Sequence, residues 1–214
     1  MIVDERLTTY LHSLDTPYSE VIREIEDQAL KDEVPIIRPE AGSLLLTLLR
    51  LQKPKKILEV GAAVGYSSIL MSTALEEGAH ITTIEKYAKR IPVCRENIRR
   101  AGKDDVITLL EGDALEIMAG LEPGFDFIFM DAAKGQYIHF LPQVRRLLRV
   151  GGVLVSDNVL QDGDLIESRY AITRRNRTIH ARMREYMWEL KHSEDFETSV
   201  LTVGDGMTIS VKLK

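Results

Sequence analysis

The chain has little that would indicate an exported or membrane-spanning protein. Only one of its 214 residues is a cysteine, Cys94, which excludes an internal disulfide framework. No apolar run approaches the roughly 20 residues that cross a bilayer. The first seven residues carry charges where a signal peptide needs an apolar segment. We therefore expect a cytoplasmic protein that has no membrane anchor.

The sequence also lacks internal repeats, low-complexity segments and any stretch typical of a linker. Hydrophobic residues make up 44% of the chain and charged residues 29%, which is ordinary for a globular protein of this length. We expect a single domain over residues 1–214. Residues 1–54 carry apolar side chains at helical spacing, which predicts an N-terminal helical cap.

Short apolar runs alternate with helical segments after residue 54, and this pattern predicts an α/β fold. Such alternation is typical of a parallel sheet with helices on both faces. The predicted strands are 56–60, 80–84, 106–110, 125–130 and 152–156. Near the end, 197–203 and 207–213 flank Gly204-Asp205-Gly206, which predicts an antiparallel hairpin.

Polar side chains stand where two of these predicted strands end. Asp131 and Lys134 follow one strand, and Asp157 and Asn158 follow the next. Ligands of parallel sheets bind at the carboxyl ends of strands, so these side chains should share one rim. Two carboxylates and an amide oxygen suit Mg²⁺ or another divalent ion such as Mn²⁺. The alternative is that each aspartate only caps a helix. Lys134 could remove a proton from a substrate, or it could simply pair with a carboxylate.

The loop after the first predicted strand lacks the Gly-x-Gly-x-x-Gly pattern of dinucleotide-binding proteins. Gly61 and Gly65 allow a tight turn, but Ala63 replaces the second glycine, which disfavours a pyrophosphate. Ser67 is expected to cap the following helix. Glu85 ends the second strand, where an acid can accept hydrogen bonds from ribose hydroxyls. Asp113-Ala114 follows the third strand, in a place suited to adenine. These features favour S-adenosylmethionine over NAD.

The segment Arg169–Arg184 contains six arginines and no acidic residue, although the formal net charge of the chain is −5. We predict a basic substrate-recognition helix over 169–191. Arginine pairs bidentately with phosphate, so this helix could contact RNA or another phosphate-bearing substrate. The alternative is an ordinary solvated helix face, although mixed charges are more usual there. The predicted RNA contacts are Arg174, Arg175, Arg177 and Arg182.

With these motifs the chain resembles the metal-dependent O-methyltransferases that include catechol and caffeoyl-CoA O-methyltransferases. The family pattern is matched by Glu59-x-Gly61-x-x-x-Gly65-Tyr66-Ser67, Glu85, Asp131-Ala-x-Lys134-x-x-Tyr137 and Asp157-Asn158. The resemblance implies a Rossmann-like, seven-stranded, mostly parallel sheet with a reversed last strand, in a homodimer. It implies the metal ligands Asp131, Asp157 and Asn158. The implied cofactor contacts are Ile37, Glu59, Gly61, Ser67, Glu85, Asp113, Ala114 and Asp131.

Two departures bear on the substrate. Ala132 stands where catechol enzymes often carry an aromatic residue or histidine, and the substrate region is the arginine-rich segment. Among bacterial members the chain most resembles the tRNA 5-hydroxyuridine methyltransferases, which implies methylation of a wobble-base hydroxyl in the anticodon region. A catechol-like or CoA-linked phenol is the alternative substrate. A catalytically silent RNA-binding protein of this fold is a third reading, which the intact metal and cofactor residues disfavour.

Overall fold

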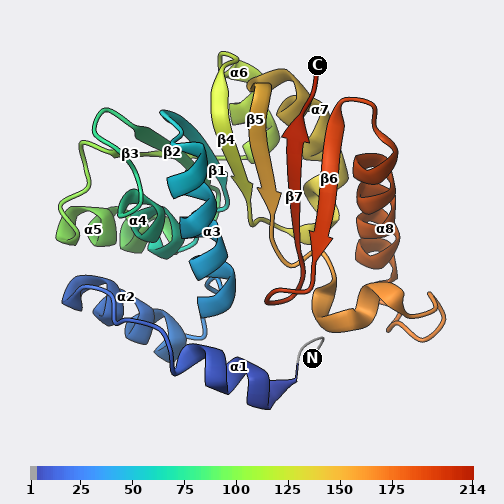
Figure 1. Ribbon diagram of the computed structural model, residues 1–214, viewed down its shortest axis with the longest axis horizontal. Coiled ribbons are helices and arrows are strands. Elements are labelled where there is room, and N and C mark those ends of the chain that lie inside the picture. Colours follow the sequence, from blue (N-terminus) through green and yellow to red (C-terminus); the bar gives the residue numbers. More distant parts are fainter. Residues whose placement is uncertain (1–3) are drawn as a thin grey trace.

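The computed structural model describes residues 4–214, and within them the strands form one seven-stranded sheet (Figure 1). The strand order is β3-β2-β1-β4-β5-β7-β6. Neighbouring strands from β3 to β5 are parallel, whereas β7 runs antiparallel to both β5 and β6. The strands are β1 (Lys56–Val60), β2 (His80–Glu85), β3 (Ile107–Glu111), β4 (Phe125–Met130), β5 (Leu148–Ser156), β6 (Phe196–Leu201) and β7 (Met207–Lys212).

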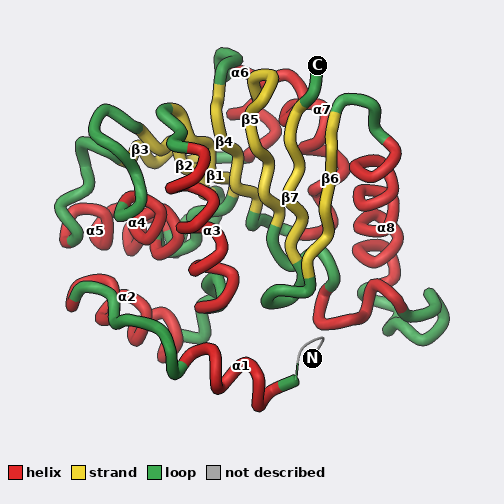
Figure 2. Tube along the Cα trace, in the orientation of Figure 1, coloured by secondary structure: helices red, strands yellow, loops and turns green. Residues whose placement is uncertain are grey.

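Helices precede the sheet, connect its parallel strands and link β5 to β6 (Figure 2). The α-helices are α1 (Glu5–His12), α2 (Glu20–Lys31), α3 (Pro39–Gln52), α4 (Tyr66–Ser72), α5 (Ile91–Arg100), α6 (Ala114–Gly120), α7 (Tyr137–Leu147) and α8 (Arg177–His192). Two short 3₁₀ helices, η1 (Lys134–Gln136) and η2 (Gln161–Ile166), follow β4 and β5. No helix among residues 4–214 combines the length and apolar character needed to cross a membrane.

Alternating side chains of the strands build a core on each face of the sheet. In β4, Phe127 and Phe129 face the core made with α2, α3, α4 and α5, while Ile128 and Met130 face the core made with α6, α7 and α8. This period of two is what a strand buried on both faces requires. The predicted α/β fold with a reversed last strand is confirmed.

Helix boundaries follow local signals in several places. Pro39 occupies the first turn of α3, where its missing N–H is no loss. Asp113 caps α6 by accepting a hydrogen bond from the backbone N–H of Leu115 at 2.9 Å. Residues 1–54, predicted as an N-terminal helical cap, contain α1, α2 and α3, and residues 1–3 lie outside the described part of the chain.

Two local predictions were wrong. The basic helix predicted over 169–191 begins only at Arg177, because residues 169–176 form turns before α8. Ser67 does not cap α4: the helix begins at Tyr66 after Gly65, which has a φ of +83°. The Ser67 hydroxyl instead donates a hydrogen bond to Glu59. Ser67 is the second residue of α4, so it lies inside the helix and not at the N-cap position, where a side-chain oxygen accepts from free backbone N–H groups.

Candidate functional site

A cavity of about 920 Å³ lies at the carboxyl ends of the parallel strands. Its wall comes from the turns after β1, β2, β3 and β4, together with residues that precede α3. Ligands of open α/β sheets bind at this edge. The volume falls in the range of pockets that hold cofactor-sized molecules.

Gly61 lets the loop after β1 pass directly over the end of β4. Its φ is +104°, and a Cβ atom there would lie 2.2 Å from the carbonyl oxygen of Asp131. The backbone N–H groups of Gly61 and Ala62 both donate to the carbonyl of Ile84 at 3.0 Å. This position therefore requires glycine.

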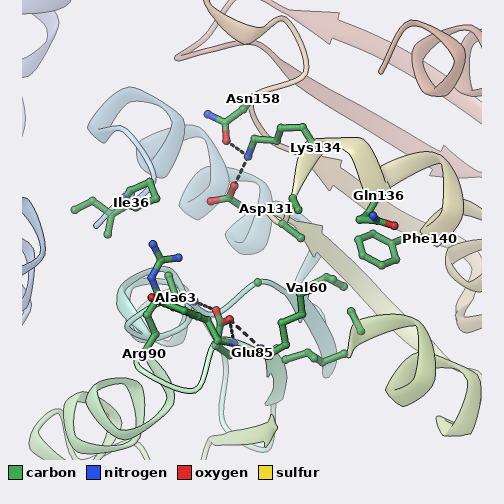
Figure 3. A pocket seen from close by; sticks show the side chains of 18 of the residues that line it. Ile36, Val60, Ala63, Glu85, Arg90, Asp131, Lys134, Gln136, Phe140 and Asn158 are labelled. Carbon is green, nitrogen blue, oxygen red and sulfur yellow. Dashed lines mark hydrogen bonds and ion pairs between the residues drawn. The ribbon is translucent and has the colours of Figure 1, made fainter. Parts of the chain in front are cut away.

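Glu85 holds this loop from the end of β2. Its carboxylate accepts hydrogen bonds from the backbone N–H groups of Ala63 at 2.7 Å, Tyr87 at 2.8 Å and Lys86 at 2.9 Å (Figure 3). The side chain also lines the cavity. Two carboxylate oxygens offer about four acceptor positions, so Glu85 retains capacity for a ligand hydroxyl.

Glu59 is a fully buried carboxylate behind the cavity wall. The Ser67 hydroxyl donates to Oε1 at 2.5 Å, and the Thr83 hydroxyl donates to Oε2. Burial raises the pKa of Glu59 to about 7, and the charge of Asp131 adds to the increase, while both hydroxyls oppose it.

This raised pKa makes the stability of the ligand-free protein fall as pH rises. The folded state binds the proton of Glu59 more tightly than the unfolded state, so the contribution is complete below pH 4.5 and is lost by about pH 7. We expect a loss of about 3 kcal/mol from this group across that window. Urea unfolding of the native protein and of Glu59→Gln at pH 5 and pH 7.5 measures it. The variant should show a smaller pH dependence; equal dependence in both proteins would contradict the assignment.

The ends of β4 and β5 are fastened together beside this loop. The buried hydroxyl of Tyr137 donates to the carbonyl of Met130 at 3.0 Å and can donate to that of Asp157 at 3.1 Å. The backbone N–H of Asp157 also donates to the carbonyl of Met130 at 3.0 Å. This arrangement fixes the positions from which Asp131 and Asn158 extend.

The side chains of Asp131 and Asn158 converge on the ammonium group of Lys134 (Figure 3). Lys134 Nζ donates to Asp131 Oδ1 at 2.8 Å and to Asn158 Oδ1. Of the two roles considered for Lys134, proton removal and pairing with a carboxylate, this arrangement shows the pairing with Asp131. Asp157 is 2% exposed, and burial together with the charge of Asp131 raises its pKa to about 7.

This donor set fits a divalent cation. Among residues 4–214 no group of three or more His, Cys, Asp or Glu side chains forms a metal cluster. A site here would therefore combine the two carboxylates with the amide oxygen of Asn158. Hard oxygen donors suit Mg²⁺ and Mn²⁺. Two neighbouring carboxylates, one of them buried, also favour a nearby positive charge.

The structure separates the predicted site residues into two groups. Lining the cavity are Gly61, Glu85, Asp113, Ala114, Asp131, Lys134 and Asn158. Buried behind its wall are Ile37, Glu59, Ser67 and Asp157. The cavity also has lining residues that the sequence analysis missed: Ile36, Arg38, Lys86, Tyr87, Arg90, Gln136, Phe140, Asp162 and Asp205. Most of these residues lie just before or after a predicted motif, and this closeness in sequence was the signal that could have identified them.

The arginines predicted to bind RNA do not line this cavity. Arg174 and Arg175 are exposed. Arg177 and Arg182 are partly buried and donate to backbone carbonyls: Arg177 Nε to Ile172 at 3.1 Å, and Arg182 Nη1 to Gly135 at 3.2 Å. Gly135 directly follows Lys134, so Arg182 anchors α8 beside the cavity.

Comparison with known proteins agrees with this geometry. Residues 12–213 match the family model described as O-methyltransferase. A caffeoyl-CoA O-methyltransferase from Populus kitakamiensis is 31% identical over 180 residues, covering 81% of this chain and 77% of that protein. A catechol O-methyltransferase from Niastella koreensis is 37% identical over 135 residues, covering 61% of each. The structure of an O-methyltransferase from Bacillus cereus in complex with SAH has a TM-score of 0.85 at 26% identity, covering 97% of each chain. The chain therefore belongs to the class I S-adenosylmethionine-dependent O-methyltransferases, in the family that includes the caffeoyl-CoA and catechol enzymes.

Proposed function

We propose that this enzyme transfers a methyl group from S-adenosylmethionine, with Mg²⁺ or another divalent ion, to 5-hydroxyuridine at the tRNA wobble position. The product is 5-methoxyuridine. The observation that carries the RNA part is the segment Arg169–Arg184, whose arginines form no ion pair with any carboxylate of residues 4–214. Unpaired guanidinium groups on a surface are suited to phosphates.

S-adenosylmethionine is proposed to bind along the turns after β1, β2 and β3. Glu85 would accept a hydrogen bond from a ribose hydroxyl at its remaining acceptor position, and Asp113-Ala114 would lie against the adenine. Gly61 and Asp131 would contact the methionine end, since they meet where the turns after β1 and β4 cross. Ile37, Glu59 and Ser67 support this wall from behind. The bound SAH of the Bacillus cereus neighbour supports the same class of ligand.

The proposed metal ligands are Asp131, Asp157 and Asn158. A bound divalent ion lowers the pKa of an acceptor hydroxyl, which makes its oxygen a better nucleophile. The chain itself orients the site: Tyr137 holds the ends of β4 and β5 together, and Lys134 keeps the oxygens of Asp131 and Asn158 side by side. A fixed acceptor oxygen facing the methyl group would supply a large part of the rate enhancement.

The basic segment is suited to hold RNA phosphates beside the cavity. Arg174 and Arg175 are exposed in the turn that precedes α8. Arg182 joins α8 to Gly135, next to Lys134. The bonds of Arg177 and Arg182 to backbone carbonyls make them supports for the segment, so Arg174 and Arg175 are the better candidates for direct phosphate contact.

A CoA-linked or catechol-like phenol is the second candidate substrate. The identities to a caffeoyl-CoA enzyme and a catechol enzyme favour it. CoA also carries phosphates, so the exposed arginines are compatible with it.

Nucleoside mass spectrometry decides between the two substrates. The enzyme should be incubated with S-adenosylmethionine, Mg²⁺ and tRNA that contains 5-hydroxyuridine. We expect conversion of 5-hydroxyuridine to 5-methoxyuridine, with little turnover of caffeoyl-CoA or catechol under the same conditions. Unmodified tRNA together with rapid methylation of either phenol would refute the RNA proposal and support the second candidate.

Replacing Arg174 and Arg175 with alanine should weaken tRNA binding and flatten its salt dependence. Each lost phosphate contact should reduce the log–log slope by roughly 0.7–0.9. Arg95→Ala combined with Arg99→Ala is the matched control, because α5 lies at the opposite edge of the sheet from α8 (Figure 1). Filter binding over a salt series measures both variants, and affinity for S-adenosylmethionine should not change. Equal slopes for the two variants would contradict the role of the basic segment.

We also propose a homodimer. Helix α1 has no buried residue and exposes Leu7, Tyr10 and Leu11 by 48%, 59% and 41%. Exposed apolar side chains on one short helix are typical of a surface that contacts another chain. Sedimentation of the native protein tests this, and a monomer at micromolar concentration would exclude it.

A further inference from the structure

The turn between β6 and β7 packs directly against the residues that follow Asn158. The backbone N–H of Val159 donates to the carbonyl of Gly206 at 2.9 Å, and that of Leu160 donates to the carbonyl of Asp205 at 3.0 Å. Gly206 has a φ of +89°, and a Cβ atom there would lie 2.4 Å from Leu160 Cγ. The sequence indicated only a hairpin turn here, but the turn also fixes the backbone beside the proposed metal site.

The side chain of Asp205 orients the amide of Asn158. Asn158 Nδ2 donates to Asp205 Oδ2 at 3.0 Å, while Asn158 Oδ1 accepts from Lys134 Nζ. A carboxylate can only accept, so it selects the nitrogen end of the amide. The oxygen end is thereby turned toward Asp131 and the cavity. Asn158 also has a φ of +55°, so its backbone conformation needs support from its neighbours.

Arg38 holds Asp205 from the opposite side. Its guanidinium forms ion pairs with Asp205 and, at 3.1 Å, with Asp162. Asp205 is mostly buried, with 18% of its side chain exposed, whereas Asp162 is 50% exposed. No hydrogen bond joins Asp162 to Asn158 among the described residues. Two carboxylates thus share one arginine, but only one of them touches the amide.

We infer that Asp205 is a positioning residue for the metal ion: it fixes the Asn158 amide with its oxygen toward the ion. The inference rests on the proposed use of a divalent cation. Partners that orient metal ligands typically contribute about 10–100-fold to metal affinity. Asp205 also adds a negative charge beside the site, which attracts a cation.

Binding of Mn²⁺ to the cofactor-free protein, measured by electron paramagnetic resonance, tests the inference without any activity measurement. Asp205→Ala should weaken Mn²⁺ binding by about 10–100-fold. Asp205→Asn keeps an acceptor oxygen for the Asn158 amide and should lose clearly less affinity than Asp205→Ala. Asp162→Asn is the matched control, because it changes the other partner of Arg38, and its Mn²⁺ affinity should stay within about twofold of the native value. Thermal unfolding should show a native-like cooperative transition in all three variants, which a general loosening of the fold would not allow.

The failures of the two proposals are distinguishable. If the native protein binds no Mn²⁺, or binds it equally well after Asp157→Ala, the proposed metal site is wrong. If binding requires Asp157 but Asp205→Ala binds Mn²⁺ like the native protein, the metal site stands and the role of Asp205 is refuted. Equal losses in Asp205→Ala and Asp205→Asn would also refute it, because charge alone would then explain the effect.

Discussion

Replacing Asp157 with alanine is expected to abolish methyl transfer while the protein stays folded. Loss of a proposed metal ligand would remove the activation of the acceptor hydroxyl, which is worth several kcal/mol, or roughly 10³-fold in rate. The stability of Asp157→Ala, in contrast to its activity, should not fall below that of the native enzyme. Asp157 is a buried carboxylate whose pKa is raised to about 7 by burial and by Asp131, so the ligand-free fold gains little from its charge near neutral pH. We expect a melting temperature equal to or above that of the native enzyme.

Chelation provides an independent form of this experiment. Excess chelator should reduce native activity to that of Asp157→Ala, and added Mg²⁺ or Mn²⁺ should restore the native enzyme but not the variant. Asp164→Asn is a suitable control, because this carboxylate is exposed and lies seven residues further along the chain. Full activity of the native enzyme in excess chelator would show that no exchangeable metal is needed.

The strands were predictable because burial on both faces leaves a clear mark in the sequence. Runs such as Phe125–Met130 are apolar except for Asp126 and are followed by polar residues, so both the strand and its functional end can be recognised. The start of α8 was not predictable in this way. Residues 169–176 and the first turn of α8 have the same arginine-rich composition. What distinguishes the turn is the burial of Ile172 and the hydrogen bond that its carbonyl accepts from Arg177, neither of which the composition indicates.

The proposed metal and cofactor residues were predictable for a topological reason. Parallel strands bring their carboxyl ends to one edge, so residues far apart in the sequence can be assigned to one site. Arg38 and Asp205 could not be found by that rule. Arg38 precedes a helix, and Asp205 lies in a hairpin turn, where aspartate is common for local reasons. Their approach to the rim depends on how the N-terminal segment and the reversed strand pack.

Glu85→Ala is expected to weaken binding of S-adenosylmethionine by roughly 10–10²-fold. One acceptor position of the Glu85 carboxylate remains for a ribose hydroxyl. A hydrogen bond to a carboxylate contributes about 1.5–3 kcal/mol, and about 1.4 kcal/mol corresponds to a tenfold change in affinity. The structure adds a second route to the same loss, because Glu85 also accepts hydrogen bonds from Ala63, Lys86 and Tyr87. Removing it could loosen the loop after β1 without any ribose contact being involved.

A ligand that lacks both ribose hydroxyls separates the two routes. Calorimetry should compare S-adenosylmethionine with this dideoxy analogue on the native protein and on Glu85→Ala, as a double-mutant cycle does for two residues. If Glu85 binds the ribose, the substitution should weaken the natural cofactor far more than the analogue. If Glu85 only holds the loop, the affinities for both ligands should fall by the same factor. Glu111→Ala is the matched control, because Glu111 pairs with Glu85 in the register of β2 and β3 but forms an ion pair with Arg95 outside the cavity. Tight binding of NADH by the native protein would overturn the cofactor assignment, because a ribose-binding acid would then serve a dinucleotide.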